Sequence, residues 1–441
     1  MHTKLSGWGN NLYALTCLRI YKNGNSRLKI SESRGGIPRG LGRSYGDSAL
    51  NSGGVTFDSS ELKKIEIQKD LGIAIVGGGV TIYDLECASL PLGFFPAVVP
   101  GTAQVTIGGA IASDIHGKSH HKVGSFSNHL AEIKLATYDG SLVSLSPEND
   151  TSQLFWATVG GMGLTGLIVE ATIRLTKVDS AFMEVTEKRV KNLDELINTL
   201  TQLNQTFLYT VAWVDLSGEF KGRGIISAAK HATVRELSSK NLLKRFAPLT
   251  KIDFAIHIPF RMNVINRLSI RLFNLFWYHK PLGKQIQHVQ RYMHPLDSVR
   301  NWNIIYGRRG FIQYQFVIPP DRVDILKTVL TKLKDDGCGS FLSVLKSFGE
   351  DSKGLLAFPM TGWTLAIDFP KNQNNLTQLL RSLDQLVTSS GGRVYLTKDS
   401  RLNYEHLPRM YPLLDEWKSV KYKMDPDNFW QSDQGRRLKL C

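Results

Sequence analysis

Apolar and polar residues alternate over several short stretches of this chain, a pattern typical of strands with one buried face. Residues 72–85 (GIAIVGGGVTIYDL) combine such a stretch with a glycine turn, after which Thr81 stands at the N-cap position of a predicted helix. This helix should end near Pro91, because proline breaks helices. Residues 130–145 predict a hairpin, since two alternating stretches flank a favoured Asp-Gly turn.

The second half of the chain, from about Val178, contains less glycine and longer alternating stretches. Residues 207–215 (FLYTVAWVD) and 310–318 (GFIQYQFVI) predict strands of an antiparallel sheet. Residues 323–333 and 376–387 carry apolar side chains at helical spacing, so each predicts an amphipathic helix. We therefore expect a second domain in which helices cover one face of a sheet.

Residues 100–117 (PGTAQVTIGGAIASDIHG) have the most unusual composition in the chain. They hold too few large side chains for an ordinary core strand and too many apolar ones for a solvent-exposed loop. Such a bare backbone can bring its N–H groups close to a ligand, as a buried pyrophosphate requires. Asp114, His116 and Lys118 place titratable groups beside it. A plain glycine-rich turn between strands is the alternative.

Residues 37–54 form another glycine-rich turn, in which three glycines bracket Arg43, Ser44 and Tyr45. Their spacing is not GxGxxG and no clear βαβ unit surrounds them, so they do not indicate a nicotinamide site. Backbone amides, a serine hydroxyl and an arginine do suit a diphosphate, although a plain surface loop is the alternative. Residues 72–85 and 154–175 add two more glycine turns in this half of the chain. A ligand shared by all four turns explains them best.

The chain has 441 residues, which predicts two or three domains, and its 42% hydrophobic and 21% charged residues are typical of a globular protein. Fifty-four Lys and Arg against 39 Asp and Glu give a net charge of +15. This excess favours an anionic partner, such as a phosphorylated substrate, an anionic lipid surface or a nucleic acid.

Four cysteines lie far apart without metal-binding spacing, so we expect reduced thiols in the cytoplasm and no metal site. The first residues contain no continuous apolar segment, and no stretch of about 18 apolar residues occurs. We therefore expect neither a signal peptide nor a membrane-spanning helix.

Residues 240–284 interleave basic and aromatic side chains, and Asp253 is their one acidic residue. This mixture suits contact with anionic lipid, because rings enter the headgroup region while cations meet phosphate. An amphipathic cap over an active site is a second interpretation. A nucleic-acid surface is a third, although no nucleic-acid motif accompanies it and we expect no such partner.

Several strings together resemble the vanillyl-alcohol-oxidase type of FAD-binding oxidoreductase, and most of all the decaprenylphosphoryl-β-D-ribose 2-oxidase family. These strings are SGWG at 6–9, GLGRSYGD at 40–47, PGTAQVTIGGAIASDIHGKSHH at 100–121, LFWATVGGMGLTG at 154–166, IQYQFVIP at 312–319, GWTLAIDFP at 362–370 and YLTKDSR at 395–401. The resemblance implies an α+β fold with an FAD-binding domain at 1–177 and a substrate-binding cap domain at 178–390. The segment 391–441 would return to the first domain.

The resemblance also implies roles for individual residues. FAD would be bound by Gly40, Leu41, Gly42, Arg43, Ser44, Tyr45, Gly46, Gly101, Thr106, Ile107, Gly108, Gly109, Ser113, Asp114, Ile115, His116, Ile168 and Tyr395. The substrate would be bound by Tyr45, Gln313, Gln315, Lys346, Thr364 and Lys398. Many members of the superfamily tether the flavin to a histidine in the first glycine turn, where this chain has Arg43. We therefore expect non-covalent FAD.

Lys398 and His116 are the candidate catalytic residues. Lys398 suits a base if burial or nearby cations lower its pKa, and a solvated lysine paired with Asp399 is the alternative. His116 either takes the proton or only hydrogen-bonds the flavin. Two departures lie in 362–370. Ala366 stands where the mycobacterial type has a cysteine, which removes a thiol but no catalytic group. Thr364 stands where that type has an asparagine, which would alter the shape of the sugar pocket.

The implied reaction oxidises the 2-hydroxyl of a polyprenyl-phosphoryl ribose to a ketone, the first half of an epimerisation to the arabinose form in cell-envelope biosynthesis. A short-chain reductase would use the product, and the protein would lie in the cytoplasm, peripheral at the inner face of the plasma membrane. A soluble sugar-alcohol or lactone oxidase using oxygen is one alternative. A basic membrane- or nucleic-acid-binding protein without catalysis is the alternative of another class.

Overall fold

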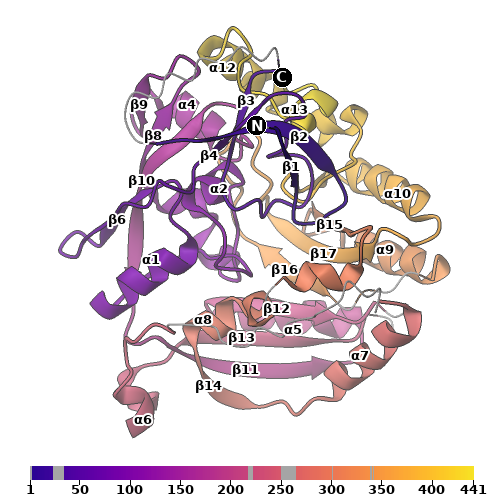
Figure 1. Cartoon of the computed structure of the whole chain (residues 1–441). Helices are drawn as coiled ribbons and strands as arrows, with labels where there is room; N and C mark the ends of the chain where they lie inside the picture. The colour runs from indigo at the N-terminus through magenta and orange to yellow at the C-terminus, as the bar shows by residue number, and fades with distance from the viewer. Residues whose placement is uncertain are drawn as a thin grey trace.

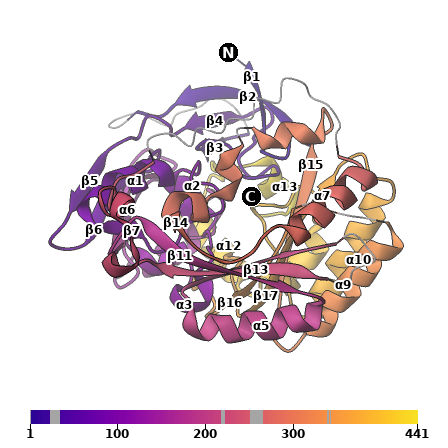
Figure 2. The ribbon, with the colours of Figure 1, turned by 90° about the horizontal axis from the view of Figure 1, so that it is seen from below.

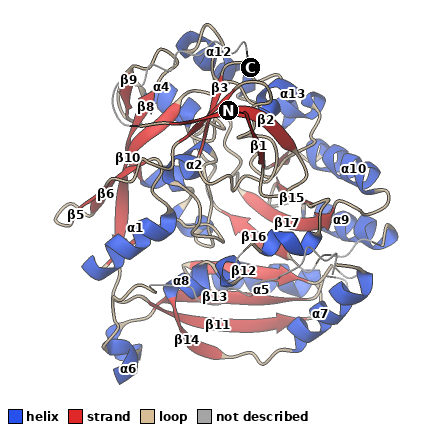
Figure 3. Ribbon diagram, in the orientation of Figure 1, coloured by secondary structure: helices blue, strands red, loops and turns tan. Residues whose placement is uncertain are grey.

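The computed structural model describes residues 2–22, 34–216, 222–249, 265–299, 301–337, 340 and 342–441. Within these residues the strands form three sheets, and helices pack around them (Figure 1, Figure 3). Both ends of the chain lie at the same end of the molecule, and the eight-stranded sheet extends to the opposite end (Figure 1). This mixture of helices with largely antiparallel sheets confirms the α+β prediction.

The first sheet carries the glycine turn 37–54. Its strand order is β1-β2-β4-β3, with bounds β1 (His2–Ser6), β2 (Tyr13–Ile20), β3 (Gly36–Arg39) and β4 (Val55–Asp58). β2 and β3 both run parallel to β4, so β3 and β4 need a connection that returns the chain to the start of the sheet. The glycine turn is part of that connection.

The second sheet follows the order β5-β6-β10-β8-β9, with β7 also pairing with β10. Its strands are β5 (Ile65–Gln68), β6 (Ile73–Gly77), β7 (Phe94–Pro96), β8 (Leu130–Ala136), β9 (Leu142–Leu145) and β10 (Leu167–Lys177). β8 and β9 form the predicted hairpin. Short helices α2 (Ile107–Ala112), α3 (His120–Val123) and α4 (Ser152–Thr158) lie between these strands in sequence.

Helix α1 (Ile82–Ser89) confirms the predicted strand, turn and helix at 72–85. Thr81 is its N-cap, because the threonine side chain accepts a hydrogen bond from the amide of Asp84 and the aspartate side chain accepts one from the amide of Thr81. A single 3₁₀ turn follows, and the chain leaves it at Gly93 with φ of 81°, a left-handed conformation that favours glycine.

The third sheet has the order β14-β11-β13-β12-β16-β17-β15-β18, and each neighbouring pair is antiparallel. Its strands are β11 (Phe182–Val190), β12 (Tyr209–Val214), β13 (Gly224–His231), β14 (Lys284–His288), β15 (Phe311–Ile318), β16 (Ser343–Phe348), β17 (Gly362–Pro370) and β18 (Arg393–Val394). The two strands predicted at 207–215 and 310–318 are therefore confirmed as members of one antiparallel sheet.

Helices α5 (Leu193–Thr206), α9 (Val323–Asp335) and α10 (Leu376–Ser389) lie on one side of this sheet (Figure 2). Their apolar faces are buried, as Ile325, Val329 and Leu333 illustrate on α9. This arrangement confirms the predicted covering of one face by helices. Shorter helices α6 (Ser239–Leu242) and α8 (Val289–Met293) and the longer α7 (Arg267–His279) belong to the same half of the chain.

The C-terminal segment packs against the glycine-rich half, where α12 (Leu414–Met424) and α13 (Asp433–Arg437) lie beside the first strands (Figure 1). Arg437 pairs with Asp47 at 2.7 Å, and the Trp417 indole donates to the carbonyl oxygen of Ala157 at 2.8 Å. These contacts support the predicted return at 391–441, although β18 shows that the chain leaves the third sheet only after Val394. The three-part domain division stays a prediction.

Candidate active site

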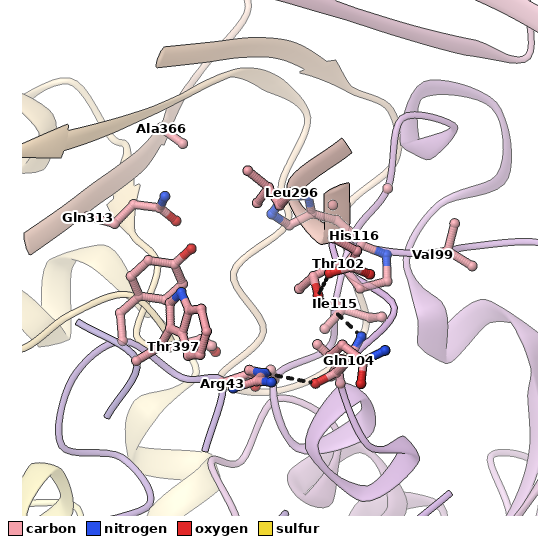
Figure 4. Close-up of a pocket in the computed structure, with 18 of the residues that line it drawn as sticks. Arg43, Val99, Thr102, Gln104, Ile115, His116, Leu296, Gln313, Ala366 and Thr397 are labelled. Atoms are coloured by element: carbon pink, nitrogen blue, oxygen red, sulfur yellow. Dashed lines mark hydrogen bonds between the residues drawn. The ribbon is translucent and has the colours of Figure 1, made fainter. Parts of the chain in front are cut away.

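A cavity of about 1360 Å³ lies between the glycine turns and the uncovered face of the third sheet. Sites for a single small molecule span roughly 300–1,000 Å³, so this cavity has room for a large cofactor together with a second ligand. Figure 4 shows its two sides, with Gln313 and Ala366 of the sheet facing Thr102 and His116 of the 100–117 stretch.

The backbone around Gly40 and Gly108 forms a cradle without side chains. A Cβ atom on Gly40 would lie 2.1 Å from the Thr106 hydroxyl oxygen, and one on Gly108 would lie 3.1 Å from the carbonyl oxygen of Gly78. The Thr106 hydroxyl also accepts a hydrogen bond from the amide of Gly109 at 3.3 Å. Glycine is therefore required for this close packing of main chain, and the bare backbone fits a diphosphate.

Arg43 supplies a positive charge at the edge of this cradle. Its Nε donates to the carbonyl oxygen of Gln104 at 3.2 Å, and its guanidinium lies 4.2 Å from the centre of the Trp8 ring (Figure 4). Burial lowers the pKa of Arg43, and the nearby Asp297 carboxylate partly offsets this. The group stays charged, since an arginine pKa lies so far above neutrality, and it suits a phosphate oxygen. Glycine backbone and arginine together fit FAD.

The uncovered face of the third sheet lines the opposite wall. Side chains two residues apart on a strand point to the same face, and alternate residues of six strands accordingly line the cavity. They are Val185 and Glu187, Val211 and Trp213, Ile225 and Ser227, Gln285 and Gln287, Gln313 and Gln315, and Val344 and Lys346. This wall is mostly apolar along β11–β13 and polar at the four glutamines of β14 and β15 and at Lys346 of β16.

His116 is held between Lys346 and Gln315. Its Nδ1 lies 3.1 Å from the Lys346 Nζ, and its Nε2 lies 2.9 Å from the Gln315 amide nitrogen. Gln315 also donates to the Thr364 hydroxyl at 3.2 Å. Burial, and secondly the charge of Lys346, lower the pKa of His116 well below its usual value. The imidazole is therefore neutral, and its single acceptor nitrogen can take a hydrogen bond from one of these two donors.

Lys398 lies over the ring of Tyr45, with its Nζ 3.6 Å from the ring centre. Burial lowers its pKa to about 7, with a further lowering by Lys346 and an opposing effect from Asp368. A pairing with Asp399 is wrong, because that carboxylate instead accepts a bond from Arg437 at 2.9 Å and bonds from two backbone amides. Lys398 is thus a cavity lysine with a substantial neutral fraction at neutral pH.

Two further lysines make the cavity electropositive. Burial lowers the pKa of Lys346 to about 8 and that of Lys118 to about 7. Lys118 lies 4.0 Å from the centre of the Tyr292 ring. A depressed lysine pKa means that the protonated form lacks compensating negative charge, so an anionic ligand would be stabilised here.

Most of the predicted site residues line the cavity. They are Gly40, Leu41, Gly42, Arg43, Ser44, Tyr45, Gly101, Thr106, Gly108, Gly109, Ser113, Ile115, His116, Ile168, Gln313, Gln315, Lys346, Tyr395 and Lys398. Segments more than 300 positions apart in the sequence thus meet in one place, as Lys398 and Tyr45 do.

Four predicted contacts lie behind the lining instead. Gly46 packs against the Asp399 carbonyl, and the side chain of Ile107 is fully buried in the core. The Asp114 carboxylate accepts bonds from the Ser127 amide and the Ser352 hydroxyl, so it holds the loop. Thr364 positions Gln315. These residues support the site from behind.

Sequence reasoning missed several lining residues, notably Trp8, Arg291, Asp297 and Trp302. Asp297 accepts bonds from the Thr102 hydroxyl and the Ala103 amide, and so ties the 100–117 stretch to the other half of the chain. The alternation along the strands could have found the sheet residues, whereas contacts between distant loops leave no local signal.

Comparison with known protein families agrees with this geometry. Residues 31–146 match a family model described as an FAD binding domain, which contains both the Gly40 turn and the Gly108 cradle. Over the described residues, no group of three His, Cys, Asp or Glu side chains could hold a metal ion, and no helix is long and apolar enough to cross a membrane. Fold and site define an FAD-dependent oxidoreductase of the vanillyl-alcohol-oxidase type.

The chain is 38% identical to decaprenylphosphoryl-β-D-ribose oxidase of Mycolicibacterium smegmatis, over 99% of this chain and 97% of that protein. It therefore belongs to the decaprenylphosphoryl-β-D-ribose oxidase family. An uncharacterised protein of Streptomyces coelicolor is 32% identical over 82% of this chain and its own full length. Cytokinin dehydrogenase 10 of rice shares 30% identity over 35% of this chain and 28% of its own. The alternative of a binding protein without catalysis is thereby set aside.

Proposed function

We propose that this protein oxidises the 2-hydroxyl of a polyprenyl-phosphoryl ribose to the 2-keto sugar. The reaction is the first half of an epimerisation to the arabinose form in cell-envelope biosynthesis, and a separate short-chain reductase takes the product. One observation carries the proposal: Gln313, Gln315, Lys346 and Lys398 face the glycine cradle within a single cavity. Two amides suit sugar hydroxyls, and the lysines suit a phosphate.

The residues of the cradle bind FAD without a covalent bond in this proposal. The His116 nitrogens face Lys346 and Gln315, and Arg43 stands in the first glycine turn. When bound, FAD supplies the acceptor for the hydride of the sugar C–H bond. The protein has to orient that carbon, exclude water and take up the hydroxyl proton.

Lys398 takes that proton in the proposed mechanism. Its pKa of about 7 leaves a large neutral fraction at neutral pH, and a neutral amine has a free lone pair. His116 is a weaker candidate, because its depressed pKa makes it a poor base and its single acceptor nitrogen already has a donor beside it. We assign to His116 the positioning of Lys346 and Gln315.

Substitution of Lys398 tests this assignment. Lys398→Met should lower turnover by about 10²–10⁴-fold, the usual contribution of a general base, while FAD stays bound and the protein stays yellow. Lys398→Arg is the matched control for charge, since arginine keeps the cation but cannot become neutral. Both variants should be inactive. An active arginine variant would show that Lys398 acts through its charge instead.

The competing activity is that of a soluble sugar-alcohol or lactone oxidase that uses oxygen. The apolar wall formed by Val211, Trp213 and Ile225 favours a substrate with a lipid portion over a free alditol. Anaerobic reduction of the bound flavin with a panel of lipid-linked and free sugars separates the two. Reduction by free alditols alone would overturn the proposal.

We also propose a cytoplasmic protein held peripherally at the inner face of the plasma membrane, where a lipid-linked sugar phosphate is found. The excess of positive charge supports contact with anionic lipid.

A further inference from the structure

Helix α7 (Arg267–His279) exposes an apolar face that no described element covers. Leu268 is 66% exposed, Leu272 58% and Phe276 73%, and these residues recur every four positions along the helix. Leu275, 44% exposed, widens the same face. Large exposed apolar patches on a folded protein mark a surface that binds something.

The opposite side of α7 explains why the helix is ordered on the protein. Ile270, Asn274 and Tyr278 are buried there, and the Asn274 amide donates to Asp215 at 2.8 Å and to the carbonyl oxygen of Ser340 at 3.1 Å. The outward leucines are therefore not needed to hold the helix in place.

A third side of α7 lines the active-site cavity through Phe273 and Trp277, whose rings stack 5.9 Å apart. With about 3.6 residues per turn, Phe276 lies between the outward leucines and these two rings around the helix. Apolar surface thus continues from the outside of the molecule, over the helix, into the cavity. The cap and lipid interpretations of 240–284 correspond to two sides of one helix; residues 250–264 of that stretch lie outside the described part of the chain.

Helix α6 carries a second, smaller group of exposed apolar side chains. Leu242 is 45% exposed and Leu243 is 90% exposed, with exposed Lys240 and Lys244 beside them. α6 and α7 lie to either side of the edge strand β14, both in the view of Figure 1 and in that of Figure 2. Leucines flanked by lysines suit the boundary between acyl chains and anionic headgroups.

We propose that α7 and α6 insert their exposed leucines and phenylalanine into an anionic bilayer, and that the prenyl chain of the substrate reaches the cavity over α7. The inference rests on the proposed lipid-linked substrate. Continuity with the cavity and the lysines beside the leucines favour a bilayer over a second copy of the chain as the occupant. Phe273 and Trp277 then contact the lipid portion of the substrate.

Vesicle sedimentation of the FAD-loaded protein tests the docking face without any substrate. The double variant Leu272→Glu/Phe276→Glu should lose at least tenfold in binding to vesicles of equal phosphatidylcholine and phosphatidylglycerol. Leu71→Glu/Leu142→Glu is the matched control, because Leu71 is 70% exposed in the turn between β5 and β6 and Leu142 is 49% exposed on β9. The control should bind as the unaltered protein does. Leu243→Glu should give a smaller loss than the α7 double variant.

Equal binding by the α7 double variant and the control would overturn the inference, as would loss of a dimer on size-exclusion chromatography without a change in vesicle binding.

Turnover of a short-chain prenyl-phosphoryl ribose in detergent separates this outcome from failure of the proposed function. The α7 double variant should retain it, because neither Leu272 nor Phe276 lines the cavity and a short prenyl chain does not extend over α7. No turnover by the unaltered protein would instead refute the substrate assignment.

Discussion

Burial is the main cause of the low pKa of Lys398, and the charge of Lys346 should shift further the pH at which the enzyme becomes active. Lys346 lowers the pKa of Lys398, which stands at about 7, and Lys346 itself has a pKa of about 8 and is therefore mostly charged at pH 7. Removing this cation in Lys346→Met takes away a repulsion on protonated Lys398. The pKa of Lys398 then rises, and less of the neutral base is present at a given pH.

The expected size follows from electrostatics. A repulsion of about 1.4 kcal/mol between two like charges equals about one pKa unit, and we take a shift of this order for the loss of the Lys346 charge. A rise of the Lys398 pKa from about 7 to about 8 lowers its neutral fraction at pH 7 from about one half to about one eleventh. Turnover at pH 7 should fall roughly fivefold, while the rate well above the new pKa stays near its plateau.

The assay is anaerobic reduction of the bound flavin at saturating substrate, followed as a function of pH. Saturation separates the effect on the base from the loss of substrate affinity that Lys346→Met also causes. Lys346→Arg keeps the charge and should leave the acid limb near pH 7. An unshifted limb in Lys346→Met, or an equal shift in Lys346→Arg, would refute the coupling between the two lysines.

Two further predictions concern the cradle and the C-terminal segment. Gly40→Ala places a Cβ 2.1 Å from the Thr106 hydroxyl and should weaken FAD binding about tenfold by flavin titration, whereas Gly283→Ala, with open space around its Cβ, should not. Asp425→Ala leaves the fully buried Lys421 ammonium, now 3.0 Å from that carboxylate, with the neutral Asn428 amide oxygen but no charged partner. It should cost about 3–5 kcal/mol in urea unfolding, against less than about 0.5 kcal/mol for the exposed Lys423→Ala.

Local features of the fold could be predicted from the sequence because the interactions that cause them lie within a few residues. Thr81 caps α1 through the amide three positions on, and the β8–β9 hairpin turns where Asp and Gly permit it. Alternation with a period of two places Gln313 and Gln315 on the same face of β15, whatever the rest of the chain does. The glycine turns likewise predicted a ligand, because glycine loses more conformational entropy on folding than other residues and needs a compensating role.

Tertiary structure decided what these pieces do together. The partner of Asp399 proved to be Arg437 and not its neighbour Lys398, and Asp114 turned away from the cavity toward Ser127. Only the folded chain brings Lys398 to Tyr45 and near Lys346. The amino-acid sequence alone determined where the strands and helices form and which chemical groups the site can contain. The depressed pKa of Lys398 and the two faces of α7 were decided by burial among residues distant in sequence, because desolvation and charge repulsion depend on distance in space.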